Sequence, residues 1–411
     1  MNVLLIAYYY PPINTGGSVR PEKTAKYLPH FGHRVTVLTQ SYEKTDLKNP
    51  EVLRIEDISL NRKNRRGIEK AQWLFLRLFS EFLNIFGIYH SIYSWWKKAV
   101  LKNGDKIIEK VKPDVILATY PPVETLEIGL EFSKKYGIPL ISDFRDGLLF
   151  EPIETKRMNK YRCIKKKYAR LEKAAALHSK AVTAIAEPIT GYFVREYGVE
   201  KVRAIPNGYD PEDLVDSSSG GELDPGYFNI VYTGRFGLSD KYNRVDYFFE
   251  ALHLLVERDS SLIKKLRINL IGQYQQEELV PLRDLIDKGI IVLHGFVPRA
   301  RALAFQAEGD LLLIITPPDR RSATSGKIFE YLHAGKPILA LTYQTVLADI
   351  IEETRSGWVV HPHKPEEITQ LLHKIVVDRD FYGSLQPDEQ AIRRYDFKSQ
   401  AGKFSRLLEE L

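Results

Sequence analysis

The feature that most constrains this chain is an alternation of strand-length apolar runs with helical patterns, which continues through nearly all of its 411 residues. Such alternation is typical of parallel sheets whose crossover helices cover both faces. In the first half the predicted strands are 2–9, 34–39, 114–120, 138–144, 181–186 and 202–206. In the second half they are 228–234, 266–272, 290–295, 310–316, 336–342 and 357–361. The sequence therefore predicts an α/β fold with two doubly wound sheets.

A linker rich in Gly, Ser, Asp and Pro separates the two series of strands at residues 207–226. We expect a Rossmann-like N-terminal domain at 1–206 and a second Rossmann-like domain at 227–390. A terminal helix at 391–411 is expected to return to the N-terminal domain. Because open α/β sheets bind ligands beyond the carboxyl ends of their strands, we expect the site in a cleft that both domains face.

Composition restricts the compartment and the partners. The single cysteine, Cys163, excludes an intramolecular disulfide and a cysteine zinc cluster, and it fits a reducing cytoplasm. Met1 leads into NVLLIAY, which is too short and uncharged at its start for a signal peptide. The net charge is +6, with the positive excess in the first 200 residues. That half should meet an anionic partner, a phosphorylated substrate or a membrane surface, and no nucleic-acid motif is present.

Residues 323–337, ATSGKIFEYLHAGKP, hold two Gly-Lys pairs around a predicted helix. Neither pair completes a Walker A loop, which disfavours a nucleotide hydrolase. Instead, Thr324 or Ser325 is expected to cap a helix that runs to about His333 and is closed by Gly335.

The first turn of that helix is a predicted anion site. The N–H groups of Ser325, Gly326 and Lys327 would point at the ligand, with the Lys327 ammonium close by. Lys327 and Glu330 are three residues apart and share a face. They form either two contacts to one ligand or a surface ion pair.

Two glycines follow the first predicted strand. Gly16 and Gly17 precede a helix expected to begin near Ser18, where backbone can approach a phosphate or sugar without an intervening Cβ. A simple turn is the alternative. The absence of GxGxxG after this strand removes the main support for a nicotinamide dehydrogenase.

Two cations occupy the loop after strand 228–234. Arg235 follows Gly234 directly, and Lys241 lies six residues further on, with Arg244 as its alternative. Two such cations can neutralise a diphosphate. Solvated loop charge is the other interpretation.

Over essentially its full length the chain resembles the retaining glycosyltransferases of family four, which have the GT-B fold of two Rossmann-like domains. The motifs that carry the resemblance are YYPPINTGGSVR, KYLPHFGHRVTVLT, DFRD, IPNGYD, YTGRF and SGKIFEYLHAGKPILAL, in this order. The resemblance implies a donor that is a UDP- or GDP-type sugar, bound mainly by the second domain. It implies no cofactor and no metal.

The resemblance also implies roles for individual residues. Arg235 and Lys241 would bind the diphosphate and stabilise the leaving group, and Glu330 would accept hydrogen bonds from the ribose. The remaining donor contacts would be Gly16, Gly17, Gly234, Arg244, Phe296, Val297, Ser325, Gly326 and Lys327. Catalysis would need no enzyme nucleophile, because the acceptor hydroxyl attacks from the face that the diphosphate leaves.

Acceptor or sugar contacts are expected from Tyr120, Asp143, Arg145 and Asp146, which lie at or directly after the ends of predicted strands. A structural ion-pair corner is the alternative for the last three. The chain departs from the family pattern at Tyr120, where many members have His, and at Ser322, where many have Glu. Residues 378–380 have the spacing of an Asp-x-Asp metal motif but are expected to be solvated charge at a helix end.

The most aromatic segment is 71–96, whose polar positions recur at helical spacing and leave a broad apolar face. Its polar positions are Arg77, Glu81, Asn84, Ser91 and Ser94. Basic residues lie on both sides of it and in 156–173, so peripheral membrane contact through 62–98 and 156–173 is one interpretation. Packing against the first domain's sheet is the other.

Together these features predict a cytoplasmic glycosyltransferase at the inner face of the cell membrane, acting on a glycan or lipid-linked acceptor in polysaccharide biosynthesis. A nucleotide-sugar epimerase or hydrolase, and a non-catalytic nucleotide-sugar or membrane-binding scaffold, are the alternatives.

Overall fold

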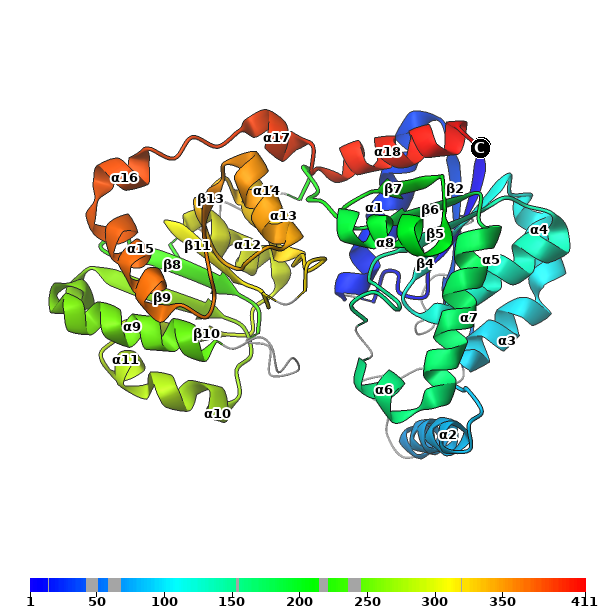
Figure 1. Cartoon of the computed structure of the whole chain (residues 1–411), viewed down its shortest axis with the longest axis horizontal. Helices are drawn as coiled ribbons and strands as arrows, with labels where there is room; N and C mark the ends of the chain where they lie inside the picture. Colours follow the sequence, from blue (N-terminus) through cyan, green and yellow to red (C-terminus); the bar gives the residue numbers. More distant parts are fainter. Residues whose placement is uncertain are drawn as a thin grey trace. The chain divides into compact units, whose positions relative to one another are not determined.

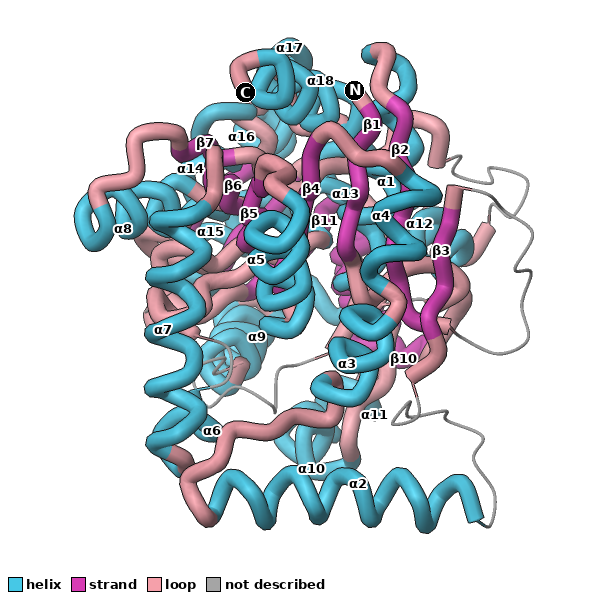
Figure 2. The backbone as a smooth tube through the Cα atoms, turned by 90° about the vertical axis from the view of Figure 1, so that its right-hand side faces the viewer, coloured by secondary structure: helices cyan, strands magenta, loops and turns pink. Residues whose placement is uncertain are grey.

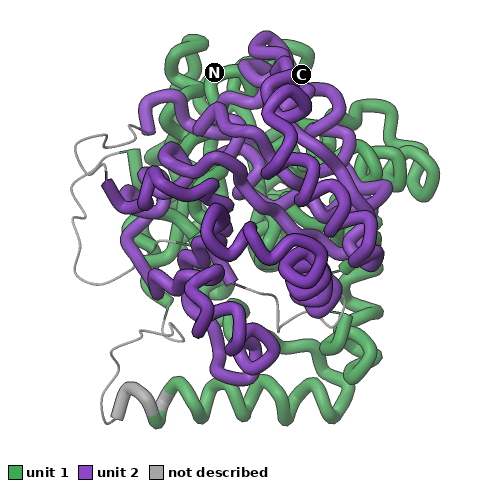
Figure 3. The backbone as a smooth tube through the Cα atoms, turned by 90° about the vertical axis from the view of Figure 1, so that its left-hand side faces the viewer, with its two compact units in different colours: residues 1–207, 397–411 green, residues 208–396 purple. Residues whose placement is uncertain are grey.

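The computed structural model describes residues 1–13, 15–41, 51–57, 68–152, 155–213, 221–235, 245–318 and 320–411. They form two compact units, coloured separately in Figure 3. Unit 1 comprises Met1–Asn207 together with Phe397–Leu411, and unit 2 comprises Gly208–Asp396. Each unit is a parallel sheet flanked by helices (Figure 1), so the predicted α/β class with two doubly wound sheets is confirmed.

Within the described residues, unit 1 has seven parallel strands in the order β3-β2-β1-β4-β5-β6-β7. They are β1 Asn2–Ile6, β2 Arg34–Gln40, β3 Val52–Ile55, β4 Val115–Tyr120, β5 Leu140–Phe144, β6 Ala181–Ala184 and β7 Val202–Ala204. Central strands such as β1 and β4 are almost continuously apolar because helices cover both faces. The edge strand β3 is not among the predicted strands, since VLRI is only four residues long and contains an arginine.

The helices of unit 1 come from both ends of the chain. They are α1 Gly16–Tyr27, α2 Ile68–Ile85, α3 Ser94–Lys102, α4 Gly104–Val111, α5 Val123–Tyr136, α6 Thr155–Lys160, α7 Arg162–His178, α8 Glu187–Tyr197 and α18 Phe397–Glu409. The last helix, α18, buries Phe404, Leu407 and Leu408 in the same apolar cluster as Val3 and Leu5 of β1. The C-terminal residues therefore complete the core around the first strand.

The aromatic segment 71–96 is not one helix with its polar positions on the outside. Helix α2 ends at Ile85 and α3 begins at Ser94. Asn84, Ser91 and Ser94 are buried, whereas the apolar positions between 74 and 88 are largely exposed. Figure 2 shows α2 as a long helix beside α6. Among the described residues, no helix combines the length and apolarity that a bilayer crossing requires.

Within the described residues, unit 2 has six parallel strands in the order β10-β9-β8-β11-β12-β13. They are β8 Phe228–Thr233, β9 Leu266–Ile271, β10 Ile291–Gly295, β11 Leu311–Ile315, β12 Ile338–Leu341 and β13 Gly357–Val360. The helices are α9 Asp246–Arg258, α10 Gln276–Leu279, α11 Arg283–Asp287, α12 Arg299–Glu308, α13 Lys327–Ala334, α14 Val346–Thr354, α15 Pro365–Val377, α16 Arg379–Gly383 and α17 Glu389–Arg393. Asp378, from the Asp-x-Asp sequence, caps α16 by accepting the N–H of Phe381 (2.9 Å).

Candidate functional site

At the carboxyl edge of the unit 2 sheet, the loop after β8 meets the start of α13. Gly234 follows β8 with a φ of 124°, and its N–H donates to the carbonyl of Ile271 (2.7 Å). A Cβ at Gly234 would lie 2.4 Å from Nζ of Lys327. The backbone conformation therefore favours glycine here, and a Cβ would also displace the flexible end of the Lys327 side chain.

Lys327 is the first residue of α13, and its side chain reaches back over β8. Its Nζ lies 4.4 Å from the ring centroid of Tyr232 and 3.3 Å from the Tyr232 hydroxyl. Burial lowers the pKa of Lys327 to about 8, while the charge of Glu330 acts in the opposite direction. The ammonium is thus poorly solvated and packed on an aromatic ring, a position in which an incoming anion would stabilise it.

Glu330 lies one turn further along α13 and is paired with an arginine that the sequence analysis missed. Arg299, at the start of α12, donates from Nε and Nη2 to Oε1 of Glu330 (3.2 and 3.1 Å) and from Nη2 to Oδ2 of Asp213 (2.9 Å). Nε2 of Gln306 donates to Oε2 of Glu330 (3.4 Å). The signal for Arg299 was its place in the loop after a predicted strand. Asp213 and Gln306 carried no such signal.

The predicted cations on the loop after β8 are only partly described. Arg235 is exposed, and its Nη2 donates to Oε1 of Gln273 on the loop after β9 (3.1 Å). Its carbonyl accepts the hydroxyl of Tyr232 (2.8 Å), which joins this loop to the ring under Lys327. Lys241 and Arg244 lie outside the described residues.

The other predicted donor contacts lie on two further loops of unit 2. Phe296 is 76% exposed after β10, whereas Val297 packs against the core. Ser325 is partly buried and Gly326 is exposed, both directly before α13.

The start of α13 corrects the predicted cap. Gly326, and not Thr324 or Ser325, directly precedes the helix, which begins at Lys327, while Oγ of Ser325 accepts the Lys327 N–H (3.4 Å). The reason is that Gly326 has helical angles (φ −54°, ψ −22°), so the chain enters from a preceding turn rather than from an extended capping residue. The predicted end is confirmed, because Gly335 closes the helix with a φ of 66°.

In unit 1, both glycines of the first post-strand loop lie inside α1. The helix begins at Gly16, two residues before the predicted start at Ser18. The space around Gly16 is open, whereas a Cβ at Gly17 would meet Nη1 of Arg145 and the ring of Tyr9, each at 3.4 Å. The Gly17 carbonyl also accepts a hydrogen bond from Nη1 of Arg145.

Asp143 lies in β5 and holds several elements of unit 1 together. Its carboxylate accepts two hydrogen bonds from Arg20 of α1 (2.7 and 3.1 Å) and one each from Thr119 and Thr183 (both 2.7 Å). Burial by itself would raise the pKa of Asp143, but the charge of Arg20 and these donors lower it. Removal of either partner would leave an uncompensated buried charge.

Arg145 and Tyr120 meet at the end of β4. The buried guanidinium of Arg145 donates to the carbonyls of Tyr120 (Nε, 3.1 Å) and Pro121 as well as Gly17. Burial lowers the pKa of Arg145. Asp146, the next charged residue, is partly buried.

Two family models match these two units. The model described as Glycosyltransferase Family 4 matches residues 15–213, and the model described as Glycosyl transferases group 1 matches residues 227–378. The chain belongs to the family-four glycosyltransferases. No curated protein matches it by sequence at a significant level.

Solved structures show the same fold as this glycosyltransferase. Sucrose-phosphate synthase from Thermosynechococcus elongatus aligns with a TM-score of 0.69 at 13% identity, covering 99% of this chain and 98% of that chain. HepE from Anabaena in complex with UDP aligns with a TM-score of 0.64 at 15% identity, covering 100% of both chains. WaaG, a glycosyltransferase involved in lipopolysaccharide biosynthesis, aligns with a TM-score of 0.59 at 17% identity, covering 98% and 99%. The expected GT-B fold is confirmed.

The glycosyltransferase is therefore a transferase that moves a glycosyl group. Chemically, the unit 2 edge offers the exposed Arg235, the poorly solvated Lys327 and a glycine that leaves room between them.

Proposed function

We propose that this glycosyltransferase transfers a hexosyl group from a UDP- or GDP-type sugar bound on unit 2, with retention of anomeric configuration and without a metal. The observation that carries the proposal is the Lys327 ammonium, packed on Tyr232 beside Gly234 and poorly solvated until an anion arrives. HepE, whose solved complexes include UDP and UDP-glucose, supports a nucleotide-sugar donor.

In this proposal the protein positions the donor and stabilises its leaving group. Arg235, Lys327 and, on the same loop as Arg235, Lys241 or Arg244 bind the diphosphate, aided by Ser325 and Gly326. Glu330 accepts the ribose hydroxyls while Arg299 fixes its orientation. Phe296 and Val297 flank the base.

The chemistry is a front-face displacement. The acceptor oxygen forms the new bond to the anomeric carbon as the bond to the diphosphate breaks, and a phosphate oxygen takes the acceptor's proton. The products are the glycosylated acceptor and the nucleoside diphosphate. Preorganised cations are then the main source of rate acceleration.

In this proposal the acceptor is a lipid-linked or polysaccharide glycan that the enzyme reaches at the inner face of the cell membrane. Exposed Lys156, Lys160, Arg162, Lys165 and Lys166 on α6 and α7 support contact with anionic lipid through 62–98 and 156–173. Residues 62–67 of that surface lie outside the described residues. WaaG's involvement in lipopolysaccharide biosynthesis supports the same acceptor class.

The test is a thermal-shift screen with UDP, GDP, ADP and their common sugars, followed by transfer assays with the donor that binds. Specific stabilisation by one nucleotide and a product with the donor's anomeric configuration, formed in the presence of EDTA, are expected. Release of free sugar, or isomerised donor without an acceptor product, would instead indicate a hydrolase or an epimerase. Binding without turnover on a broad acceptor panel would indicate a scaffold.

A further inference from the structure

Helix α2 presents an exposed apolar face that its own unit leaves uncovered. Six large apolar side chains on this helix are between 36% and 66% exposed: Leu74, Phe75, Leu78, Phe79, Phe82 and Ile85. They recur at intervals of three and four residues and so share one side of the helix. Phe86 and Ile88 continue the surface beyond its end, at 67% and 57% exposed. A contiguous patch of this kind marks an interaction site.

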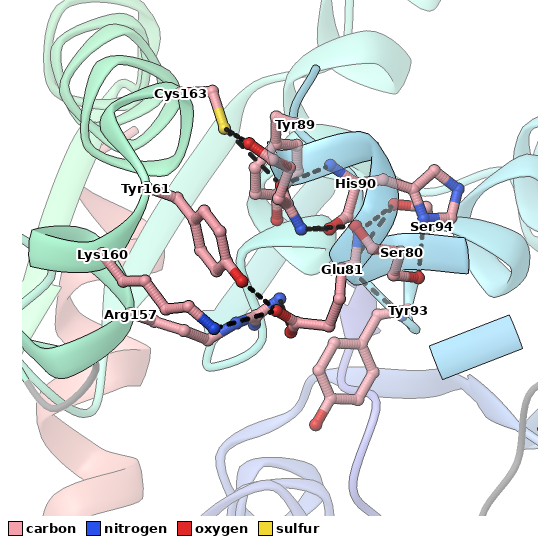
Figure 4. A network of polar contacts seen from close by, with 12 residues as sticks. Ser80, Glu81, Tyr89, His90, Tyr93, Ser94, Arg157, Lys160, Tyr161 and Cys163 are labelled. Atoms are coloured by element: carbon pink, nitrogen blue, oxygen red, sulfur yellow. Dashed lines mark hydrogen bonds and ion pairs between the residues drawn. The ribbon is translucent and has the colours of Figure 1, made fainter. Parts of the chain in front are cut away.

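The opposite face of α2 is fixed by polar contacts, shown in Figure 4. The hydroxyl of Ser80 lies 3.0 Å from Nδ1 of His90, and Nδ2 of Asn84 donates to the His90 carbonyl (2.8 Å). The hydroxyl of Tyr161 donates to Oε2 of Glu81 (2.5 Å), and Arg157 lies 3.8 Å from the same carboxylate. Turning the apolar face inward would break this network, so the exposure is built into the fold.

A pocket of about 180 Å³ lies at the carboxyl edge of the unit 1 sheet. Among the described residues, five tyrosines line it: Tyr9, Tyr89, Tyr93, Tyr120 and Tyr168. We call it the tyrosine pocket. Tyr89 follows the exposed Ile88 directly, and Arg157 both lines the pocket and pairs with Glu81 of α2. The tyrosine pocket is thus joined to the apolar surface through Ile88 and Tyr89, whereas Arg157 joins it to Glu81 on the opposite, polar face of α2.

The polar groups of the tyrosine pocket define what it can hold. The hydroxyls of Tyr9 and Tyr93 lie 2.7 Å apart on one wall, and Arg157 supplies a guanidinium. Beneath them Oε1 of Glu124 accepts the hydroxyls of Ser91 and Tyr89, while its buried Oε2 has no hydrogen-bond partner among the described residues. Because Oε2 of Glu124 is fully buried, the polar groups that line the pocket for a ligand are the tyrosine hydroxyls and Arg157.

The size of the tyrosine pocket limits its occupant to a head group. Small-molecule sites usually enclose about 300–1,000 Å³, which is larger than this pocket. A hydroxylated ring or glycerol unit with one anionic group would match the tyrosines and Arg157. The apolar part of such a molecule would extend outside the pocket, and Ile88, the neighbour of Tyr89 in the sequence, is exposed there.

We propose that the acceptor is an amphiphile bound by unit 1 in two parts, with a hydroxylated, anionic head in the tyrosine pocket and an apolar chain along α2. This inference rests on the proposed function and selects the lipid-linked acceptor over a soluble polysaccharide. The basic residues of α6 and α7 supply charge complementary to an anionic lipid surface around the same site.

The first test uses lipid binding alone and does not depend on glycosyl transfer. Dihexanoylphosphatidylglycerol, below its micellar concentration, carries a hydroxylated, anionic head and is titrated calorimetrically into the full chain. Arg157→Gln is expected to weaken its binding at least fivefold. Unchanged affinity in this variant would overturn the assignment of the head to the tyrosine pocket.

The second test uses sedimentation with vesicles of phosphatidylcholine containing 30% phosphatidylglycerol. Phe75→Ser/Leu78→Ser is expected to reduce vesicle binding at least tenfold, because both side chains are exposed and their loss leaves the polar network intact. Leu177→Ser is the matched control, since Leu177 is 60% exposed on α7 and not on α2, and it should bind as wild type. Equal binding by the double variant, or concentration-dependent dimerisation that this variant abolishes without any lipid binding, would overturn the proposal.

The transfer reaction separates this inference from the proposed function. If Arg157→Gln and Phe75→Ser/Leu78→Ser bind UDP normally but lose transfer to a lipid-linked acceptor, the proposed function and the amphiphilic acceptor are both supported. Full transfer to a soluble polysaccharide by the double variant would refute the amphiphile while leaving glycosyl transfer intact. Lipid binding with the expected variant pattern, but no turnover of any sugar nucleotide, would refute the proposed function alone.

Discussion

Replacement of Lys327 by methionine is expected to stabilise the fold and abolish donor binding at the same time. Methionine keeps an unbranched apolar stem but removes the ammonium. In the folded chain that ammonium lies on Tyr232, while Arg299 pairs with the nearby Glu330. Within the described residues, the positive charge has therefore lost water without forming an ion pair of its own.

The size of the effect follows from the pKa of Lys327, which burial lowers from 10.5 to about 8. At roughly 1.36 kcal/mol per pKa unit, this difference corresponds to at most about 3 kcal/mol. Lys327 is only partly buried, and solvent screening reduces the expected gain for Lys327→Met at pH 7 to about 2 kcal/mol. Between pH 8 and 10.5 the unfolded state binds more protons at this residue, so its contribution to wild-type stability rises with pH there. The advantage of the variant should shrink over that interval.

The assay is urea denaturation of wild type and Lys327→Met at pH 7 and pH 9.5, with calorimetric titration of UDP and GDP. Lys264→Met, at an exposed position of unit 2, is the control and should change neither property. A Lys327→Met protein less stable than wild type at pH 7 would refute the claim that the buried charge of Lys327 lowers the free energy of unfolding. Unchanged nucleotide affinity would refute the place of Lys327 in the donor site.

Three further substitutions test other contacts. Arg235→Ala should lower kcat by about 100-fold or more. Its unfolding midpoint should not change, because the Arg235 side chain is exposed, and full activity of the folded variant would show that Arg235 is not part of the site. Asp143→Ala should lower the free energy of unfolding in urea by about 3–5 kcal/mol, because it leaves the buried Arg20 charge unpaired, and adding Arg20→Met should recover part of this loss. A loss below about 1 kcal/mol for Asp143→Ala would contradict this account. Gly234→Ala should lower the free energy of unfolding by about 1–3 kcal/mol and weaken nucleotide binding measured by thermal shift, whereas Gly16→Ala should be tolerated because the space around Gly16 is open. Equal effects of the two substitutions would disprove the crowding at Gly234.

Much of the fold follows from the order of apolar runs along the chain. Each predicted strand of the second half has a counterpart in the unit 2 sheet, because a parallel strand covered on both faces must be apolar almost throughout. The short β3 escaped prediction because an edge strand is covered less and needs no such run. The place of α18 in the core of unit 1 depends on packing with Val3 and Leu5, about 400 positions earlier in the sequence.

Some residues of the candidate site could likewise be predicted from the sequence, and others could not. Gly234, Arg235 and Lys327 could be predicted because post-strand loops of a parallel sheet meet at one edge. The ring of Tyr232 beneath Lys327 and the pairing of Arg299 with Glu330 could not, since each joins residues that are 31 or more positions apart and depends on side-chain directions.

The segment 71–96 shows most clearly what the sequence determined and what the tertiary structure decided. Its sequence by itself determined that apolar side chains share one face, because the helical repeat places residues three and four apart together. Only the tertiary structure decided which face is buried. Glu81 and Asn84 find partners in Tyr161 and His90, so the polar side turns toward the protein and Phe75, Leu78 and Phe82 turn outward. Periodicity fixes which residues lie together on a helix, whereas the partners available on neighbouring elements fix the direction they face.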